Sequence, residues 1–302
     1  MSSTTLRPAR GSRHHTVARA LWRRPWLRGT LTLSTPLLWF TVVYLASLVV
    51  MLITAFWSVN PLTNQLDHSF SLTNFRTILT GTYLRIIGHT LLMAIAVTVT
   101  DAIVAFPVAY FMARVASART RRWLMTLTVL PLWASYLARV YAWIVILQKG
   151  GALSWTAGKL GVGPIDIAYS NTAMWIVFSY IWLPYMIMPI FGALEKIPDS
   201  YLEASADMGA RGWSTLRRVI LPLALPGVAA GSIFTFSLTL GDFITPILIG
   251  GTGASFIGNA IYDNIGTAGN LPFAAALAVV PIVIMLVYLV GARFAGAFED
   301  VS

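Results

Sequence analysis

Cysteine is absent from the 302-residue sequence, and charged residues are scarce. Without cysteine the chain has no disulfides, no thiolate metal site and no thiol nucleophile. Charged residues make up 11% of the chain and hydrophobic residues 57%, whereas a soluble domain carries about 25% charged residues. Most of the chain is therefore predicted to lie in lipid.

Signatures of nucleotide binding and catalysis are also missing. There is no G-x-x-x-x-G-K-[ST] phosphate loop, because Leu160 follows the Gly158–Lys159 pair. Neither H-E-x-x-H nor G-x-S-x-G occurs, and the four histidines are scattered. We therefore expect a non-catalytic chain without a bound cofactor or metal, so that any use of ATP would require an ATPase from elsewhere.

Long apolar runs predict six transmembrane helices, since about 20 apolar residues cross a bilayer. Windows of about 19 residues place them at 34–57, 86–113, 123–147, 173–194, 223–249 and 273–297. The predicted fold class is an all-α integral membrane protein. It has a basic arm at 1–33, a transmembrane domain at 34–297 and a tail at 298–302.

The first apolar run is expected to be an uncleaved anchor rather than a secretory signal. It covers about 24 residues, whereas a signal h-region has about 7 to 15. No small-x-small cleavage site follows it before Trp57.

Lysine and arginine are distributed unevenly between the two sides that six spans define. The arm, the connections after the second and fourth spans, and Arg293 hold sixteen of them, against four on the other side. The positive-inside rule therefore predicts that both termini are cytoplasmic. The net charge of +10 is explained by this topology and by contact with anionic lipid, so that no nucleic-acid partner is expected.

Small residues and prolines modify several spans. Gly227 and Gly231 form a small-xxx-small pair that allows close helix approach. Prolines within spans either shape the bundle or provide bending points for a pathway that opens and closes. They are Pro107, Pro131, Pro184, Pro189, Pro226, Pro246 and Pro281.

The connection at 195–222 is predicted to be structured. Asp199 or Ser200 can cap a short helix that Gly209 ends, and a second short helix covers 213–219. Such a helix pair either docks into a groove on a partner or lies on lipid headgroups as an amphipathic connector.

Residue spacing in this connection resembles the EAA motif of membrane subunits in binding-protein-dependent ATP-binding-cassette importers. That motif reads E-A-A, three residues, G, nine residues, I-x-L-P. The matching residues here are Glu203, Ala204, Ser205, Gly209, Val219, Leu221 and Pro222. Ser205 and Val219 depart from the motif, which has alanine and isoleucine at those positions.

Three further stretches resemble permeases of the spermidine/putrescine type. They are PLWASYLARVYAWIVIL (131–147), PYMIMPIFGALEKIP (184–198) and SLTLGDFITPILIGG (237–251), and the likeness extends over 34–297. A polyamine is therefore the first candidate solute, with another small organic ion as the alternative.

The resemblance implies a type I (MetI-like) importer subunit of the bacterial inner membrane, which forms half of a translocation pathway. It further implies a second permease, preferably a different chain, two ATPase subunits that use ATP and Mg²⁺, and an extracytoplasmic solute-binding protein. It assigns coupling to the ATPase to Glu203, Ala204, Asp207 and Gly209. A stand-alone secondary transporter is the competing hypothesis.

Three charged residues, Asp101, Arg139 and Asp242, fall within predicted spans, where each is costly unless it faces the bundle or water. Arg139 and Asp242 lie roughly 24 and 28 Å from the cytoplasmic starts of their helices, so we expect them to be neighbours near the outer end of the pathway. A structural ion pair or snorkelling to the surface is the alternative. Asp101 lies deeper and could meet a cationic solute alone. Aromatic faces also attract cations; the candidates are Tyr136, Tyr141, Trp143, Tyr180, Trp182 and Tyr185.

Overall fold

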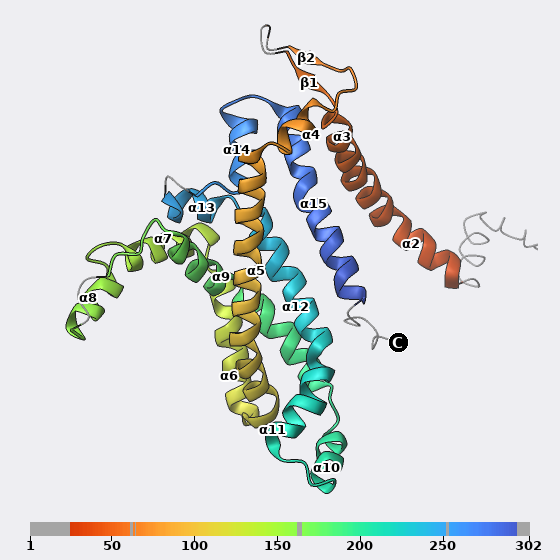
Figure 1. The fold of residues 1–302 in the computed structure, drawn as a ribbon. Coiled ribbons are helices and arrows are strands. Elements are labelled where there is room, and N and C mark those ends of the chain that lie inside the picture. Colours follow the sequence, from red (N-terminus) through yellow and green to blue (C-terminus); the bar gives the residue numbers. More distant parts are fainter. Residues whose placement is uncertain (1–24, 61–62, 64, 162–164, 252–253, 295–302) are drawn as a thin grey trace, which may run out of the picture. The chain divides into compact units, whose positions relative to one another are not determined.

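The computed structural model describes residues 25–60, 63, 65–161, 165–251 and 254–294, which are mostly helical (Figure 1). Most of the predicted basic arm and the tail at 298–302 lie outside these residues. The chain divides into two units, residues 1–53 and 54–302, and each is described by itself.

The first unit contains a helical segment of apolar residues. It consists of α2 (Pro25–Phe40), a π-helical stretch η1 (Thr41–Leu45) and α3 (Ala46–Thr54). Large side chains such as Leu38, Trp39 and Phe40 are exposed. The segment covers the predicted first span up to Thr54, and its exposed apolar side chains suit lipid.

The second unit contains the remaining elements, which follow one another in this order: β1 (Ser58–Val59), β2 (Leu66–Asp67), α4 (Thr73–Ile78), α5 (Gly81–Tyr110), η2 (Phe111–Val115), α6 (Ala118–Val129), η3 (Leu130–Trp133), α7 (Tyr136–Leu147), α8 (Ala152–Lys159), α9 (Asn171–Glu195), α10 (Asp199–Asp207), α11 (Gly212–Thr215), η4 (Leu216–Ile220), α12 (Leu221–Gly241), α13 (Ile244–Ile249), α14 (Ile257–Gly266) and α15 (Leu271–Phe294). The β1–β2 hairpin and the α10–α11 pair lie at opposite ends of this unit (Figure 1).

The core of the second unit consists of α5, α9 and α12, which pack side by side. Added Cβ atoms show how closely α12 approaches α9: at Gly227 one would lie 2.5 Å from Ala193 Cβ, and at Gly231 2.7 Å from Met186 Sδ. Only glycine permits this spacing, which confirms the predicted small-xxx-small contact.

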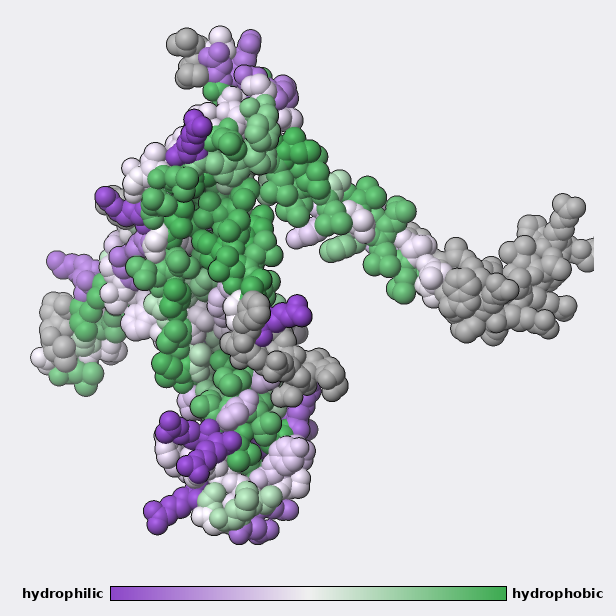
Figure 2. Space-filling view, turned by 45° about the vertical axis from the view of Figure 1, so that its right-hand side comes forward, coloured by the Kyte–Doolittle hydropathy of each residue, from purple (hydrophilic) through white to green (hydrophobic). Residues whose placement is uncertain are grey.

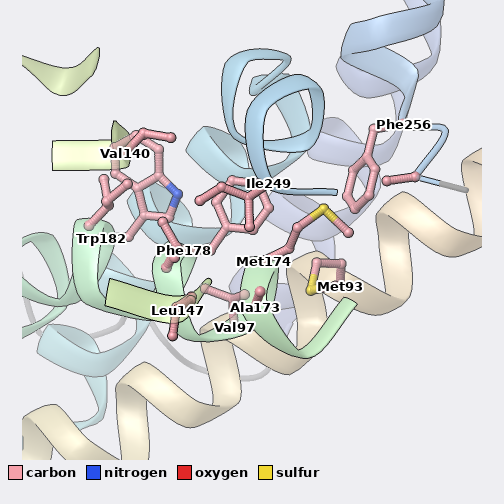
Figure 3. Close-up of a cluster of buried hydrophobic side chains, with 13 residues drawn as sticks. Met93, Val97, Val140, Leu147, Ala173, Met174, Phe178, Trp182, Ile249 and Phe256 are labelled. Atoms are coloured by element: carbon pink, nitrogen blue, oxygen red, sulfur yellow. The ribbon is translucent and has the colours of Figure 1, made fainter. Parts of the chain in front are cut away.

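A hydrophobic cluster fastens α7 and α13 to this core (Figure 3). Met93 and Val97 of α5 meet Met174 and Phe178 of α9 there, and the cluster continues to Trp182, Val140, Leu147, Ile249 and Phe256. All of these side chains are buried. Their packing fixes the segments that carry Tyr136 and Asp242.

The β1–β2 hairpin and α4 form a small polar cap. The amide of Asn74 donates to the carbonyls of Ala55 (3.0 Å) and Trp57 (2.8 Å) and so fixes the start of α4. The Ser69 N–H donates to the Asp67 carboxylate (2.9 Å), which holds the pKa of Asp67 below its usual value.

The predicted third span at 123–147 is not one helix, so the prediction of a continuous helix is wrong. The chain instead bends by 96° between Ala118–Trp133 and Tyr136–Lys159. Pro131 lacks the N–H that would continue α-helical bonding, and the helix tightens to the 3₁₀ segment η3 before Ala134 and Ser135 adopt extended conformations. Both halves are apolar, so hydropathy did not reveal the bend.

The predicted fifth span at 223–249 is also interrupted. Helix α12 ends at Gly241, Asp242 is extended, and α13 begins at Ile244. The Asp242 carboxylate accepts hydrogen bonds from the backbone N–H groups of Ile244 (2.8 Å) and Thr245 (3.3 Å). Asp242 directly precedes the N-cap residue Phe243, and its carboxylate takes the place of an N-cap side chain for the first turn of α13.

The remaining predicted spans correspond to single helical segments. Those at 86–113 and 173–194 lie within α5–η2 and α9, and α15 covers the last one up to Phe294. Among the described residues, five helices are long and apolar enough to cross a membrane, and the bent pair would make a sixth. Hydrophobic surface covers these helices, whereas hydrophilic residues gather at the ends of the second unit (Figure 2).

Candidate coupling surface and intramembrane site

The segment with EAA-like spacing forms two short helices, α10 and α11, joined by a tight turn. Pro198 occupies the N-cap position of α10, and no side chain caps this helix. The expected capping by Asp199 or Ser200 is therefore wrong. Asp199 lies in the first turn instead, and its carboxylate forms an ion pair with Arg114 at 2.8 Å.

Gly209 ends α10 in a left-handed conformation with φ of 77°. The Gly209 N–H donates to the Ala206 carbonyl (2.8 Å), and the Ala210 N–H donates to the Ser205 carbonyl (3.1 Å). This pair of bonds is the Schellman motif, which favours glycine at the left-handed position. The predicted role of Gly209 as the helix end is confirmed.

Ser205, which replaces an alanine of the motif, connects the two helices. Its side chain is buried, and its Oγ lies 2.9 Å from Thr215 Oγ1 on α11. The two hydroxyls satisfy one another, so the departure from the motif adds a polar contact between α10 and α11.

The outer face of α10 and α11 is both acidic and apolar. Glu203, Ala204 and Asp207 are exposed, and neither acid forms an ion pair with any described residue. Large apolar side chains are exposed beside them: Tyr201 at 52%, Met208 at 80% and Trp213 at 73%. We call Tyr201, Glu203, Ala204, Asp207, Met208 and Trp213 the coupling surface.

Sequence reasoning placed Met208 on the helix but gave it no part in binding. A large apolar residue directly before the glycine that ends a helix indicates an exposed apolar side chain, because the turn leaves few residues to cover it. Exposed apolar side chains beside unpaired charges are typical of interaction sites.

Asp242 forms the centre of a second candidate site, between the broken helices α12 and α13. The hydroxyl of Tyr136 donates to its carboxylate, and the Thr245 hydroxyl donates to the same oxygen at 2.9 Å. With the two backbone donors of α13, four groups compensate for removing this carboxylate from water. Tyr136 begins α7, so the breaks in two helices meet at this point.

A hollow of about 330 Å³ opens beside this carboxylate. Tyr136 and Trp182 stack there, with ring centroids 5.9 Å apart and planes inclined by 19°. The remaining lining residues are Ser237, Leu238, Gly241 and Phe243. The hollow thus combines one acid with three aromatic residues, of which Tyr136 and Trp182 stack on one another.

The structure places Arg139 and Asp242 against the same tyrosine. The guanidinium carbon of Arg139 lies 5.8 Å from the centre of the Tyr136 ring, and Tyr136 bonds to Asp242. Among the described residues, the ion pairs are Arg114–Asp199 and Arg121–Glu195, so Arg139 and Asp242 do not pair directly. Sequence reasoning named Tyr136 among the aromatics without recognising this bridging position.

Asp101 does not line the hollow beside Asp242. It lies in α5 and is fully buried, and neither carboxylate oxygen has a hydrogen-bond partner. The hydroxyl of Ser179 on α9 is the polar group that faces it, and this hydroxyl is also without a partner. The three predicted pathway residues therefore do not form one site.

Fold and site together define a class: a multi-pass membrane protein with a structured helix pair outside its apolar body. Residues 105–299 match the family described as "Binding-protein-dependent transport system inner membrane component". The chain belongs to this family and is a permease subunit of an ATP-binding-cassette importer in the inner membrane.

Two relatives from Escherichia coli (strain K12) illustrate the similarity. The inner membrane ABC transporter permease protein YdcU is 44% identical over 296 residues, which cover 94% of each chain. The spermidine/putrescine transport system permease protein PotB is 33% identical over 218 residues, which cover 72% of this chain and 79% of the relative.

Solved structures show the same fold. A bacterial ABC transporter involved in the import of the acidic polysaccharide alginate has a chain that matches with a TM-score of 0.74 at 18% identity, covering 95% of this chain and 100% of that one. The predicted type I importer fold is thereby confirmed.

Proposed function

We propose that this chain forms half of the pathway of an ATP-driven importer of small organic cations, with polyamines as the first candidate. In this proposal it pairs with a second, different permease. Two ATPase subunits use ATP and Mg²⁺, and an extracytoplasmic binding protein delivers the solute. Family membership and the relatives named as spermidine/putrescine permeases support the proposal.

The α10–α11 end is assigned to the cytoplasmic side, together with both termini. The excess of arginine and lysine at this end supports the orientation. The segment at 195–222 then faces the ATPase subunits, and the β1–β2 hairpin faces the solute-binding protein.

The substrate assignment depends on one observation: the Asp242 carboxylate adjoins a hollow lined by three aromatic residues. A carboxylate attracts an ammonium group, and aromatic faces add cation–π attraction. Because all four donors to Asp242 come from the protein, an incoming ammonium group replaces the Tyr136 hydroxyl. Binding is weak in consequence, as a passage requires.

Asp101 is kept as a candidate pathway residue in this proposal. Its carboxylate is closed off between α5 and α9, so a solute reaches it only when these helices separate. Such separation is a feature of alternating access, in which one bundle has two packings.

A second candidate substrate is a zwitterionic organic ion, favoured by Arg139. Its guanidinium lies over the ring of Tyr136, whose hydroxyl donates to Asp242, and its Nε is buried without a hydrogen-bond partner. A solute with both an amine and a carboxylate would use both residues.

The substrate test measures uptake of labelled putrescine, spermidine and glycine betaine into proteoliposomes that hold the complete transporter. Asp242→Asn keeps an oxygen for capping α13 but removes the charge, so polyamine uptake falls about tenfold or more. The matched control is Asp263→Asn on α14, an exposed acid. Equal uptake by Asp242→Asn and the wild type would contradict the cation assignment, and uptake of betaine alone would favour the zwitterion.

The same vesicles test coupling to the ATPase. Glu203→Lys reverses a charge on the coupling surface, so ATP hydrolysis continues without solute uptake. Arg119→Glu reverses an exposed charge on α6 that is not part of that surface, and keeps uptake. Uptake that persists without ATP would instead favour a stand-alone secondary transporter.

A further inference from the structure

Arg114, the penultimate residue of η2, connects three helical segments through one guanidinium. Its Nη1 donates to Asp199 Oδ1 in α10 at 2.8 Å, and its Nη2 donates to the carbonyls of Leu194 (2.6 Å) and Ile197 (2.5 Å) at the end of α9. The Arg114 side chain is 12% exposed, whereas that of Asp199 is 82% exposed. The arginine is therefore enclosed, and its partner is at the surface.

These contacts supply donors to carbonyls at and just beyond the end of α9, where the Leu194 carbonyl otherwise has only a long bond from the Ile197 N–H (3.4 Å) and a contact from Lys196 N–H. The last carbonyls of a helix lack intrahelical donors, and a cation there also favours the negative end of the helix dipole. Asp199 lies in the first turn of α10, where an acid favours the positive end. Arg114 thus binds the end of one helix and the start of the next.

Arg121 on α6 makes a parallel set of contacts at the same end. Its Nε donates to the Met112 carbonyl (3.1 Å), its Nη2 to the Ala113 carbonyl (3.2 Å) and its Nη1 to Glu195 at 3.2 Å. This guanidinium ties α6 to η2 and α9. It does not reach α10, so its role differs from that of Arg114.

The chain itself joins α10 to α9 and, through α11, to α12, but it makes no such connection to α5. Among the described residues, Arg114 is the residue that joins the α5–η2 segment to α10 by an ion pair. Apolar contacts around Met112, Ile197 and Leu202 fill the space beside it. Apolar packing permits sliding, whereas a forked guanidinium fixes direction.

We infer that Arg114 is a positioning residue that makes α5 follow the movement of the coupling surface. This inference depends on the proposed contact between that surface and an ATPase. With Ser205 holding α10 to α11, a force on the coupling surface reaches α9 and α12 through the chain and α5 through Arg114. Without Arg114, α5 follows this force only through its packing against α9 and α12 and through the contacts of Arg121, so its movement is less tightly coupled to α10.

The test compares Arg114→Ala and Arg114→Lys with Arg122→Ala in the complete transporter. Arg122 lies on the same connection and bonds only within its own helix, to the Ala118 carbonyl. We expect solute moved per ATP hydrolysed to fall about tenfold in Arg114→Ala, within the usual range of coupling between sites. Arg114→Lys is expected to restore little of this coupling, because an ammonium group lacks the planar, forked donors of a guanidinium. Arg122→Ala is expected to match the wild type.

A distance measurement separates this role from a purely structural one. Because the chain has no cysteine, spin labels at Ser200→Cys on α10 and Ile103→Cys on α5 are the only ones in this subunit. Both positions are exposed. In the wild type we expect the same distance distribution with and without ATP, and in Arg114→Ala a distribution that shifts when ATP binds.

Unchanged transport per ATP in Arg114→Ala, or unchanged distances with ATP, overturns the inference. If Arg114→Ala does not assemble, Asp199→Asn provides the test, because it keeps the shape of an exposed side chain while removing the ion pair and the charge at the start of α10. We expect transport per ATP to fall about threefold. Failure of the proposed function would give a different result. The wild-type transporter, or the Glu203→Lys variant, would then move solute whether or not ATP is present.

Discussion

At the scale of single residues, backbone conformation decides which glycines matter. Gly209 and Gly212 both lie beside the coupling surface, and a Cβ at either position would have no atom within 4 Å. Only Gly209 has a positive φ, of 77°. The two positions therefore differ in conformational cost and not in available space.

Gly209→Ala is expected to lower the free energy of unfolding by about 1 kcal/mol. The Cβ of alanine lies too close to the backbone carbonyl in the left-handed conformation, whereas glycine has no Cβ. Gly212→Ala lies at the start of α11 and is expected to be neutral or stabilising by up to about 1 kcal/mol. Thermal unfolding of the purified subunit in detergent measures both. A loss of equal size at both positions would contradict the assignment of strain to Gly209.

At the scale of elements, the two interrupted spans contain the chemistry of the intramembrane site. Tyr136 starts α7 and Asp242 precedes α13, so the site exists only because both helices break. Straight helices would leave the Asp242 carboxylate without its backbone donors.

Removal of that cap is expected to loosen α13. Asp242→Ala removes the acceptor for the Ile244 and Thr245 N–H groups, and loss of a cap costs about 1 kcal/mol. Hydrogen exchange of α13 should therefore accelerate about fivefold. Thr245→Val, which keeps the cap, is the control; equal protection in Asp242→Ala and the wild type would refute the capping role.

Hydropathy predicted where apolar segments lie, because lipid exposure requires long runs whatever their internal shape. It missed the bends at Pro131 and Asp242, because proline occurs in many continuous membrane helices and an acid within a span has several explanations. Depth separated Asp101 from Arg139 and Asp242, but it gave no indication of what Asp101 faces. Depth does not specify which face of α5 turns toward α9. Asp101 is buried on that face and therefore does not line the hollow.

At the scale of the molecule, the absence of cysteine allows a direct test of the proposed orientation. Single cysteines at Ser200 on α10 and Ser69 beside the hairpin are exposed and are the only thiols in the chain. In intact cells we expect an impermeant maleimide to label Ser69→Cys and to leave Ser200→Cys unlabelled until the membrane is opened. The reverse pattern would show that the orientation is opposite to the proposed one. Labelling of both cysteines in intact cells would contradict the proposal that they lie on opposite sides of the membrane.

The length of the α5–η2 helix has a mechanical consequence. Its 35 residues, Gly81–Val115, extend about 52 Å, whereas the hydrocarbon core of a bilayer is about 30 Å thick. About 20 Å of helix therefore extends beyond the hydrocarbon core, and Arg114 is near one tip. A tilt of about 10° around the midpoint moves that tip by roughly 4 to 5 Å. The helix can thus act as a lever, for which a small displacement at one surface gives a displacement of similar size and opposite direction at the other.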